Sequence, residues 1–380
     1  MRRFIPSNGL WWLSGAILVL LLLPTIRFQF LEAGFRWLYI LLFSFSLSYT
    51  LTPFVRSIAV KRSVLDRPNE RKIHLVPTPL LGGLAVYLGT LGSIAANAII
   101  SEGMVTVLLA GTLIMVVGLI DDVRGLSAGV RLCAQLLAMT MVILSGKVLT
   151  LFPAGWMGSS LNVVITVLWI IGITNALNFF DGMDGLATGI TAIIAFFLGA
   201  VAFQTHQPLL GWFALAIVGS CLGFLPYNFR PSKPASIFLG DTGSSFLGFI
   251  LACLAVKGNW AEGNPIVSLS NPILIFGVLI YDMVHITAAR IITGKVASFR
   301  AWIQYVGKDH LHHRLATLLG TQKGSVFLIY LLSICLGLGA IMLRNARTVD
   351  ALLLLVQATM MVIVLSILEQ KGRSRLYKQR

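Results

Sequence analysis

The segment Leu161–Gly185, LNVVITVLWIIGITNALNFFDGMDG, begins as an apolar run and ends in a polar one. A helix needs about 20 apolar residues to cross the roughly 30 Å of hydrocarbon in a bilayer. Asn175, Asn178, Asp181 and Asp184 follow at every third residue, a spacing that would place them in one row on a helix. Amide and carboxylate oxygens suit a hard cation such as Mg²⁺, or hydrogen bonds to a nucleoside. The segment therefore predicts a membrane-spanning helix that ends in a polar site.

The composition of the whole chain agrees with a membrane protein. Of the 380 residues, 57% are apolar and only 11% are charged, whereas about 25% charged residues is usual in soluble domains. Disorder is excluded because it requires low hydrophobicity and high charge. The four cysteines show no paired spacing, so neither a disulfide framework nor a Cys-x-x-Cys metal site is indicated.

Apolar runs recur along the chain and predict an all-α, polytopic integral membrane protein with about 11–12 transmembrane helices. The runs cover residues 9–26, 36–59, 79–100, 104–120, 130–145, 161–178, 186–203, 209–227, 240–256, 268–290, 325–343 and 350–368. The first run follows Met1-Arg2-Arg3 and resembles a signal peptide, but no clear A-x-A cleavage site follows it. We therefore expect it to remain as an additional N-terminal helix.

The basic residues predict the orientation of these helices. With the N-terminus in the cytoplasm and the helices alternating, 23 of the 29 Lys and Arg residues lie on the cytoplasmic side, as the positive-inside rule requires. The net charge of +15 then reflects topology, and a nucleic-acid partner is not needed to explain it. The acidic and histidine motifs described below fall on the same side. We therefore expect the active site to face the cytoplasm.

Asp121 and Asp122 end one apolar run, and Arg131 follows them. Adjacent carboxylates repel each other, and either Mg²⁺ or a nearby arginine would relieve the repulsion. Alternatively, one of the two carboxyl groups keeps a proton and serves as a base.

Two further loops carry groups suited to phosphate. Residues 66–83 contain Lys72 and His74 before the pair Gly82-Gly83, where the backbone allows close approach of a ligand. Residues 238–245 read FLGDTGSS, which surrounds Asp241 with small residues at the start of a helix. Backbone N–H groups there would bind oxygen anions and Asp241 a cation, while Phe238 would stack on a base.

A histidine-rich loop lies at residues 307–315, GKDHLHHRL. His310, His312 and His313 suggest zinc at first sight, but no Cys or Glu ligand stands beside them and the spacing differs from that of zinc proteases. Donors to a diphosphate or a sugar are the better interpretation. Asp282 and His285, in the run 268–290, are interpreted as a buried structural pair.

Together these motifs resemble the polyprenyl-phosphate N-acetylhexosamine-1-phosphate transferases, glycosyltransferase family 4. The matching signatures are D-x-P-N-x-R-K-x-H-x-x-P-T-P-x-x-G-G, D-D-x-x-G-L-S, N-A-x-N-x-x-D-G-x-D-G-L-A, F-x-G-D-x-G-S and H-x-H-H-R-L, in order over residues 66–315. The histidine motif with Arg314-Leu315 is most similar to the branch of undecaprenyl-phosphate N-acetylglucosamine-1-phosphate transferases. Two departures are the additional N-terminal helix and Ile280-Tyr281 before Asp282, where family members often have a proline.

The resemblance implies a Mg²⁺-dependent enzyme, with Mn²⁺ able to substitute, in the bacterial cytoplasmic membrane. Its substrates would be a UDP-N-acetylhexosamine and undecaprenyl phosphate, its products UMP and a lipid-linked sugar that starts an envelope polymer such as O-antigen or teichoic acid. A homodimer is left open. Residues 1–35 would be the additional helix and a short outer loop, 36–343 the transferase membrane domain, and 344–380 the last helix and a basic tail.

The resemblance also implies residue roles. By motif position, the catalytic residues are Asp121 and Asp122; the metal ligands Asn178 and Asp241; the nucleotide-binding residues Asp181, Asp184 and Phe238; the phosphate-binding residues Arg131, Lys72 and His74; and the diphosphate- or sugar-binding residues His310, His312, His313 and Arg314.

Other activities remain open at this stage. The same chemistry could use N-acetylfucosamine, N-acetylquinovosamine or the UDP-MurNAc-pentapeptide in place of N-acetylglucosamine. A proton-coupled transporter of anionic solutes would explain acids near the membrane, but it explains poorly why they gather on one surface.

Overall fold

The computed structural model describes residues 9–68, 76–261, 264–294, 307 and 309–378. In this part of the chain nearly every residue with regular structure is helical, and the one sheet is a two-stranded antiparallel ladder in which Leu65 faces Pro79. The helices are α1 (Gly9–Leu22), α2 (Pro24–Glu32), α3 (Arg36–Lys61), α4 (Gly82–Ala96), α5 (Glu102–Arg124), α6 (Ala128–Leu144), α7 (Trp156–Phe179), α8 (Leu186–Gln204), α9 (Pro208–Asn228), α10 (Gly240–Lys257), α11 (Pro265–Ile275), α12 (Gly277–Ile292), α14 (Leu311–Leu319), α15 (Gln322–Met342) and α16 (Thr348–Lys378); the strands are β1 (Leu65–Asp66) and β2 (Thr78–Pro79).

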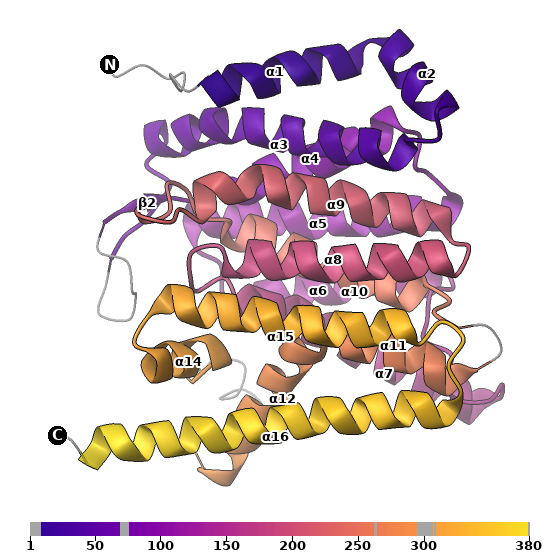
Figure 1. Ribbon diagram of the computed structural model, residues 1–380, viewed down its shortest axis with the longest axis vertical. Coiled ribbons are helices and arrows are strands. Elements are labelled where there is room, and N and C mark those ends of the chain that lie inside the picture. The colour runs from indigo at the N-terminus through magenta and orange to yellow at the C-terminus, as the bar shows by residue number, and fades with distance from the viewer. Residues whose placement is uncertain (1–8, 69–75, 262–263, 295–306, 308, 379–380) are drawn as a thin grey trace.

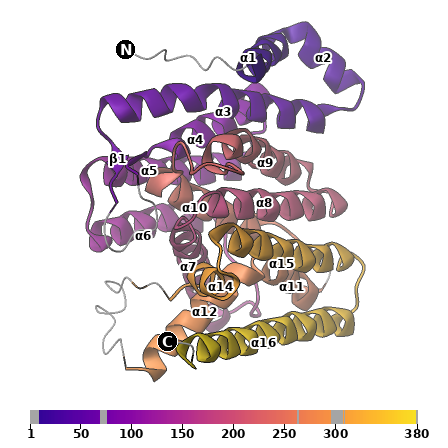
Figure 2. The ribbon, with the colours of Figure 1, turned by 60° about the vertical axis from the view of Figure 1, so that its left-hand side comes forward.

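The helices lie side by side and form a broad slab. Figure 1 shows α3, α9, α8 and α15 stacked as one layer, and these neighbours pack on one another in that order. The start of α1, the end of α16, β2 and α14 lie at the same end of the bundle. We call this end the loop face. Helices α4, α5, α10 and α7 lie behind the first layer in Figure 1 and to its left in the turned view of Figure 2.

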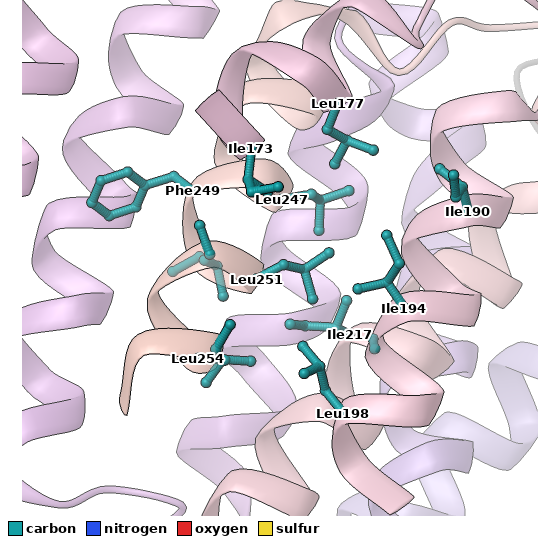
Figure 3. Packing of buried hydrophobic residues seen from close by; sticks show 14 of the residues in the cluster. Ile173, Leu177, Ile190, Ile194, Leu198, Ile217, Leu247, Phe249, Leu251 and Leu254 are labelled. Atoms are coloured by element: carbon teal, nitrogen blue, oxygen red, sulfur yellow. The ribbon is translucent and has the colours of Figure 1, made fainter. Parts of the chain in front are cut away.

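Helix α10 is the centre of the bundle. Almost all of its side chains are buried, and it packs on α4, α5, α7 and α8. Figure 3 shows Leu247 and Leu251 of α10 among branched apolar side chains of α7, α8 and α9, such as Ile173, Ile194 and Ile217. In a bilayer such contacts stabilise the bundle through close van der Waals packing between helices, so α10 and the groups at its start are held firmly.

The chain is an all-α polytopic membrane protein. Seven helices of the described chain are long and apolar enough to cross a membrane, and nine spans result if each of two bent pairs is counted as one. Helices α4 and α6 are shorter apolar helices, and α10, which begins with the polar stretch GDTGSS, occupies the remaining predicted position.

Two predicted single helices are in fact broken. Residues 9–26 bend by 78° between α1 and α2, because Leu23 precedes Pro24 and its backbone is therefore extended. Residues 268–290 bend by 79° between α11 and α12, between Pro272 and Gly277, the two residue types least favourable inside a helix. The additional N-terminal segment is thus a bent pair packed against α3.

Candidate active site

Four helix ends meet at the loop face and bring together polar groups from distant parts of the sequence. These are the C-terminal ends of α5 and α7 and the N-terminal ends of α6 and α10. Because α10 is buried on all sides, its first turn is fixed relative to the other three ends. This arrangement explains why motifs far apart in sequence form one site.

Asp241, in the first turn of α10, receives hydrogen bonds from two other helices. Its Oδ1 accepts one from Asn178 Nδ2 at 2.7 Å, and its Oδ2 accepts one from Arg131 Nη1 at 2.8 Å. Asn178 Nδ2 also lies 2.9 Å from the Ser244 hydroxyl. The two predicted metal ligands are therefore in contact.

Asp121 shares Arg131 with Asp241. Arg131 Nη1 lies 3.0 Å from Asp121 Oδ2, while Asp121 Oδ1 accepts a hydrogen bond from the backbone N–H of Leu126. Arg131 therefore bridges Asp121 and Asp241, whereas the sequence had suggested an arginine or Mg²⁺ between Asp121 and Asp122.

Asp122 points to a different target from Asp121. Its Oδ1 accepts a hydrogen bond from the Asp241 N–H at 2.9 Å, and its Oδ2 accepts bonds from the N–H and hydroxyl of Thr242. A carboxylate at a helix start accepts hydrogen bonds from N–H groups that have no partner within the helix. The positive end of the helix dipole also stabilises its negative charge. Asp122 therefore caps α10 and fixes the direction of Asp241.

The glycine-rich loop supports the same turn from the other side. Gly82 N–H and Gly83 N–H donate to the carbonyl oxygens of Phe238 and Leu239, at 2.9 and 2.7 Å. Phe238 N–H donates in turn to the Pro79 carbonyl oxygen at 2.8 Å. The predicted phosphate-binding residues Lys72 and His74 lie outside the described residues.

The prediction that four polar residues form one row on a helix is wrong for the last two of them. Helix α7 ends at Phe179, so Asn175 and Asn178 share the helix whereas Asp181 and Asp184 lie in the turn that follows. The turn ends at Gly185, directly before α8, and Gly185 has a positive φ of 78°, a conformation that favours glycine.

Asp181 lies close enough to the other acids for their charges to act on it. Burial raises the pKa of the Asp181 carboxyl well above its usual value, and the negative charges of Asp241 and Asp122 raise this pKa further. Like charges in a poorly solvated environment raise the pKa of a carboxyl group, and a bound cation would lower that pKa again. Asp184 instead ties down the loop after α9, because its Oδ2 accepts the Ala235 N–H at 2.7 Å.

The histidine motif forms a short helix, not the predicted loop. His310 stands before α14, and His312, His313 and Arg314 lie in its first turn. Buried Asp282 of α12 anchors this helix: its Oδ2 lies 2.8 Å from His310 Nδ1, and its Oδ1 accepts the Leu311 N–H at 2.6 Å. Asp282 is thus a buried structural residue as predicted, but its partner is His310; His285 lies beside the Tyr281 ring.

His312 is the most deeply buried of the three histidines, with 1% of its surface exposed. Neither of its ring nitrogens has a hydrogen-bond partner within the described residues, and the same holds for Nε and Nη2 of Arg314. Burial lowers the pKa of His312 well below its usual value, and the nearby His313, His310 and Arg314 lower it further. Unpaired buried polar atoms are rare in proteins, and here they are suited to a polar ligand.

The turn after α7 joins the acidic cluster to the histidine helix. The Phe179 ring packs on His310 at 4.9 Å between centroids, and the Phe180 ring on His312 at 5.5 Å. A Cβ atom added to Gly182 would lie 2.9 Å from His312 Nε2, so the ring lies directly against this glycine. Asn178, Asp181 and His312 therefore belong to one continuous site.

The site residues fit a divalent cation in one particular way. Among the described residues, no group of three or more His, Cys, Asp or Glu side chains is arranged to hold a metal ion by itself. Magnesium commonly takes only one or two carboxylates and completes its shell with water and substrate phosphate. Asp241 and Asn178, beside the raised-pKa carboxyl of Asp181, match that donor set.

Gln135 and Asn228 had no predicted role, and Asn175 was predicted only as part of the polar row. Gln135 and Asn175 exchange amide hydrogen bonds between α6 and α7, one turn away from Arg131 and Asn178. Asn228 holds both sides of the turn after Asp184, since it accepts the Gly185 N–H and donates to the Ile237 carbonyl oxygen. A polar side chain inside an apolar run is the only sign in the sequence that such a residue has a role. It does not show which residue the side chain binds.

The fold and the site define a multi-pass membrane protein with one polar site at the loop face. Residues 104–259 match the model of glycosyl transferase family 4. A Bacillus subtilis protein named "Probable undecaprenyl-phosphate N-acetylglucosaminyl 1-phosphate transferase" is 36% identical over 306 residues, covering 78% of this chain and 82% of that protein. The chain belongs to glycosyl transferase family 4.

Other relatives carry two kinds of name. The decaprenyl-phosphate N-acetylglucosaminephosphotransferase of Mycolicibacterium smegmatis is 31% identical, over 75% of this chain and 76% of its own length. A phospho-N-acetylmuramoyl-pentapeptide-transferase of Staphylococcus haemolyticus is 30% identical, over 58% of this chain and 74% of its own length. The similarity to the N-acetylglucosamine relatives therefore extends over more of the chain.

Proposed function

We propose that this protein transfers N-acetylglucosamine 1-phosphate from UDP-N-acetylglucosamine to undecaprenyl phosphate, in the cytoplasmic membrane of a bacterium and with the loop face toward the cytoplasm. The observation that carries the proposal is the continuity of the acidic cluster around Asp241 with the buried histidine helix. The names of the relatives supply the substrate class.

The proposed reaction exchanges one phosphoanhydride bond for another. An oxygen of undecaprenyl phosphate attacks the sugar-linked phosphorus of the UDP-sugar, the bond between that phosphorus and the bridging oxygen breaks, and UMP leaves with the bridging oxygen. Catalysis of such transfers consists mostly of positioning and charge neutralisation. The attacking phosphate is already ionised near pH 7, so Asp121 need not act as a base.

The residues divide this work between them. Arg131, which bridges Asp121 and Asp241, would bind the lipid phosphate beside the acidic cluster. The Arg314 guanidinium, whose Nε and Nη2 have no hydrogen-bond partner among the described residues, and the ring of His312 would bind the diphosphate or the sugar. Asp184 and Phe238, on the loops around the site, would contact the nucleoside. Asp122 acts indirectly, because its oxygens hold the start of α10.

Asp241 and Asn178 would hold Mg²⁺, which when bound neutralises charge on the diphosphate of the donor. The neighbouring Asp181 supports this assignment: burial raises the pKa of its carboxyl, and the negative charges of Asp241 and Asp122, which a cation would neutralise, raise it further.

A second candidate uses the same chemistry with UDP-MurNAc-pentapeptide. The relatives named phospho-N-acetylmuramoyl-pentapeptide-transferase favour it, but their similarity covers 58% and 53% of this chain, against 78% for the Bacillus subtilis relative.

The experiment is to measure UMP release by the purified protein in detergent. UDP-N-acetylglucosamine, undecaprenyl phosphate and Mg²⁺ are supplied together and then omitted one at a time. We expect UMP only when all three are present. UMP formed with UDP-MurNAc-pentapeptide or another UDP-sugar instead would change the substrate and keep the mechanism. No UMP with any donor, from folded protein, would contradict the proposal.

A further inference from the structure

The last helix, α16, carries one acidic residue on its buried side near the loop face. Most large apolar side chains of its second half, such as Ile363, Val364 and Leu368, are exposed at the edge of the slab, as expected for a helix facing lipid. Glu369 is only 5% exposed. A buried carboxylate in an apolar helix is costly unless a charged or polar partner stabilises it.

Glu369 meets Arg314 of the histidine helix. Glu369 Oε2 lies 3.3 Å from Arg314 Nη1, and the Arg314 side chain is 4% exposed. Arg314 Nη2 lies 3.9 Å from Asp282 Oδ1, the oxygen that accepts the Leu311 N–H. Arg314 is therefore held between two carboxylates and is closer to the one on α16.

This contact extends a buried chain of polar groups to the site. Glu369 holds Arg314, Asp282 holds His310 and the start of α14, and α14 presents His312 to Gly182. Helix α16 makes a second polar contact one turn earlier, between the hydroxyls of Ser366 and Tyr281 of α12, at 2.7 Å. Figures 1 and 2 show α14 beside this end of α16, against which it packs.

We propose that Glu369 is a positioning residue for the transfer reaction, acting through Arg314 on the histidine helix. The inference rests on the proposed function. By drawing Arg314 toward α16, Glu369 leaves Asp282 to bind His310 and the Leu311 N–H. It thereby keeps Nε of Arg314 and the His312 ring available to the substrate, while Nη2 of Arg314 stays 3.9 Å from Asp282 Oδ1.

Loss of the Glu369 charge has a direct physical consequence. A buried arginine without its nearer carboxylate moves toward the other one it contacts in the described structure, which is Asp282. Asp282 would then bind Arg314 at the expense of His310 and the Leu311 N–H. The first turn of α14, with His312, would shift relative to the acidic cluster, and a misplacement of about 1 Å can lower a rate about 100-fold.

The test compares E369Q, which keeps the shape and removes the charge, with E369D, which keeps the charge on a shorter stem. S366A is the matched control, because it removes the other polar contact of α16 without touching Arg314. For E369Q we expect kcat to fall about 10- to 100-fold, with the KM for UDP-N-acetylglucosamine within about threefold of the original. E369D should lose less activity, and S366A should stay within about threefold of the unsubstituted protein.

A double-mutant cycle with R314Q tests the route of the effect. If Glu369 acts through Arg314, E369Q adds little to the loss that R314Q already causes. Three results would overturn the proposal: kcat of E369Q within threefold of the unsubstituted enzyme, an equal loss in S366A, or additive losses in the double variant. If E369Q does not fold, E369M, which has a similar volume and no charge, carries the test, and an unchanged kcat in E369M then overturns the proposal.

The unsubstituted protein is assayed in parallel and separates the two proposals. Absence of UMP from it, with every donor, contradicts the proposed function. Activity in the unsubstituted protein together with an unaffected Glu369 variant contradicts only the role of Glu369.

Discussion

Asp241 accepts hydrogen bonds from Asn178 of α7 and Arg131 of α6, and its own N–H is bound by Asp122 of α5. We expect Asp241→Asn to lower kcat by at least about 100-fold, because the substitution removes the charge that faces the reacting phosphates and would hold the cation. The protein should still insert and unfold near its original temperature, since the asparagine keeps the shape. The measurement is UMP release, with thermal unfolding in parallel.

A carboxylate at the opposite end of the bundle provides the control for Asp241. Asp350, in the first turn of α16, accepts the Arg347 N–H at 2.8 Å and lies far along the chain from the site motifs. Asp350→Asn should therefore leave UMP release within about twofold, as expected for surface substitutions. Activity of Asp241→Asn within tenfold of the original would contradict the role assigned to Asp241.

His312 gives a prediction about pH and stability. Its pKa is well below 6.5 in the folded protein, chiefly through burial, and returns to about 6.5 on unfolding. Below about pH 6.5 the unfolded state therefore binds more protons, so the stability that His312 confers falls as the pH decreases through this range, and it does not change above it. We expect the unfolding temperature of His312→Asn to depend less on pH, between pH 7.5 and pH 5, than that of the unsubstituted protein.

The comparison between variants is needed because other groups titrate too. The raised pKa of Asp181 changes stability in the opposite direction, because the folded protein keeps the Asp181 proton to higher pH than the unfolded protein does. Asp181 is present in the unsubstituted protein and in His312→Asn, so its contribution is common to both. His206→Asn is the control, because His206 is an exposed histidine in the α8–α9 connection and asparagine tolerates its positive φ of 56°. An equal pH dependence with and without His312 would show that its burial is not linked to folding.

At the scale of the element, the start of α10 depends on glycine. Gly240 has a φ of 74°, and a Cβ added there would lie 2.5 Å from Asp122 Oδ2. Gly125, after α5, has a similar φ of 70°, but an added Cβ would meet no atom of the described residues within 4 Å. The two glycines therefore separate backbone strain from the clash with the capping carboxylate.

We expect Gly125→Ala to lower the free energy of unfolding by about 1–2 kcal/mol, the cost of a left-handed conformation for alanine. Gly240→Ala should lower it further and also remove most of the activity, because the displaced Asp122 no longer fixes Asp241. Thermal unfolding and UMP release measure the two effects. Equal behaviour of the two variants would mean that the Asp122 cap does not position the site.

The elements also show how far the sequence could lead. Apolar length predicted the positions of the helices, because a bilayer imposes that length on any span. The bends after Leu23 and Phe276 were not predicted, although prolines and a glycine stand near them. The histidine helix α14 was not predicted either, since a short amphipathic helix between polar segments depends on its packing against α12, α15 and α16 for stability.

The acidic half of the site was more predictable than the histidine half. Asp121, Asp241 and Asn178 lie at helix ends, so their assembly follows once the helices alternate across a bilayer. The bond of His310 to Asp282 and that of Arg314 to Glu369 depend on which side of α12 and α16 faces α14. Helix contacts of this kind are set by tertiary packing, which a single sequence does not specify.

At the scale of the whole molecule, the charge distribution and the bundle agree. Among the six basic residues that the alternating helices place outside, Lys147 and Arg344 lie in connections and Lys257 ends α10, all at the end of the bundle opposite the loop face. The positive-inside rule then predicts that the loop face lies in the cytoplasm, the side from which the proposed nucleotide-sugar donor would come. We expect a cysteine at Lys233, in the exposed connection between α9 and α10, to be inaccessible to a membrane-impermeant maleimide in intact cells and to react after lysis. A cysteine at Arg347, between α15 and α16, should react in intact cells, because the Arg347 side chain is 88% exposed at the opposite end.

The native Cys221 and Cys253 are buried and should react in neither condition, whereas Cys133 and Cys335 are exposed and are replaced by serine in the background protein. If the Lys233 position is labelled in intact cells and the Arg347 position is protected, the loop face lies outside the cytoplasm. The proposed reaction would then have no access to its nucleotide-sugar donor.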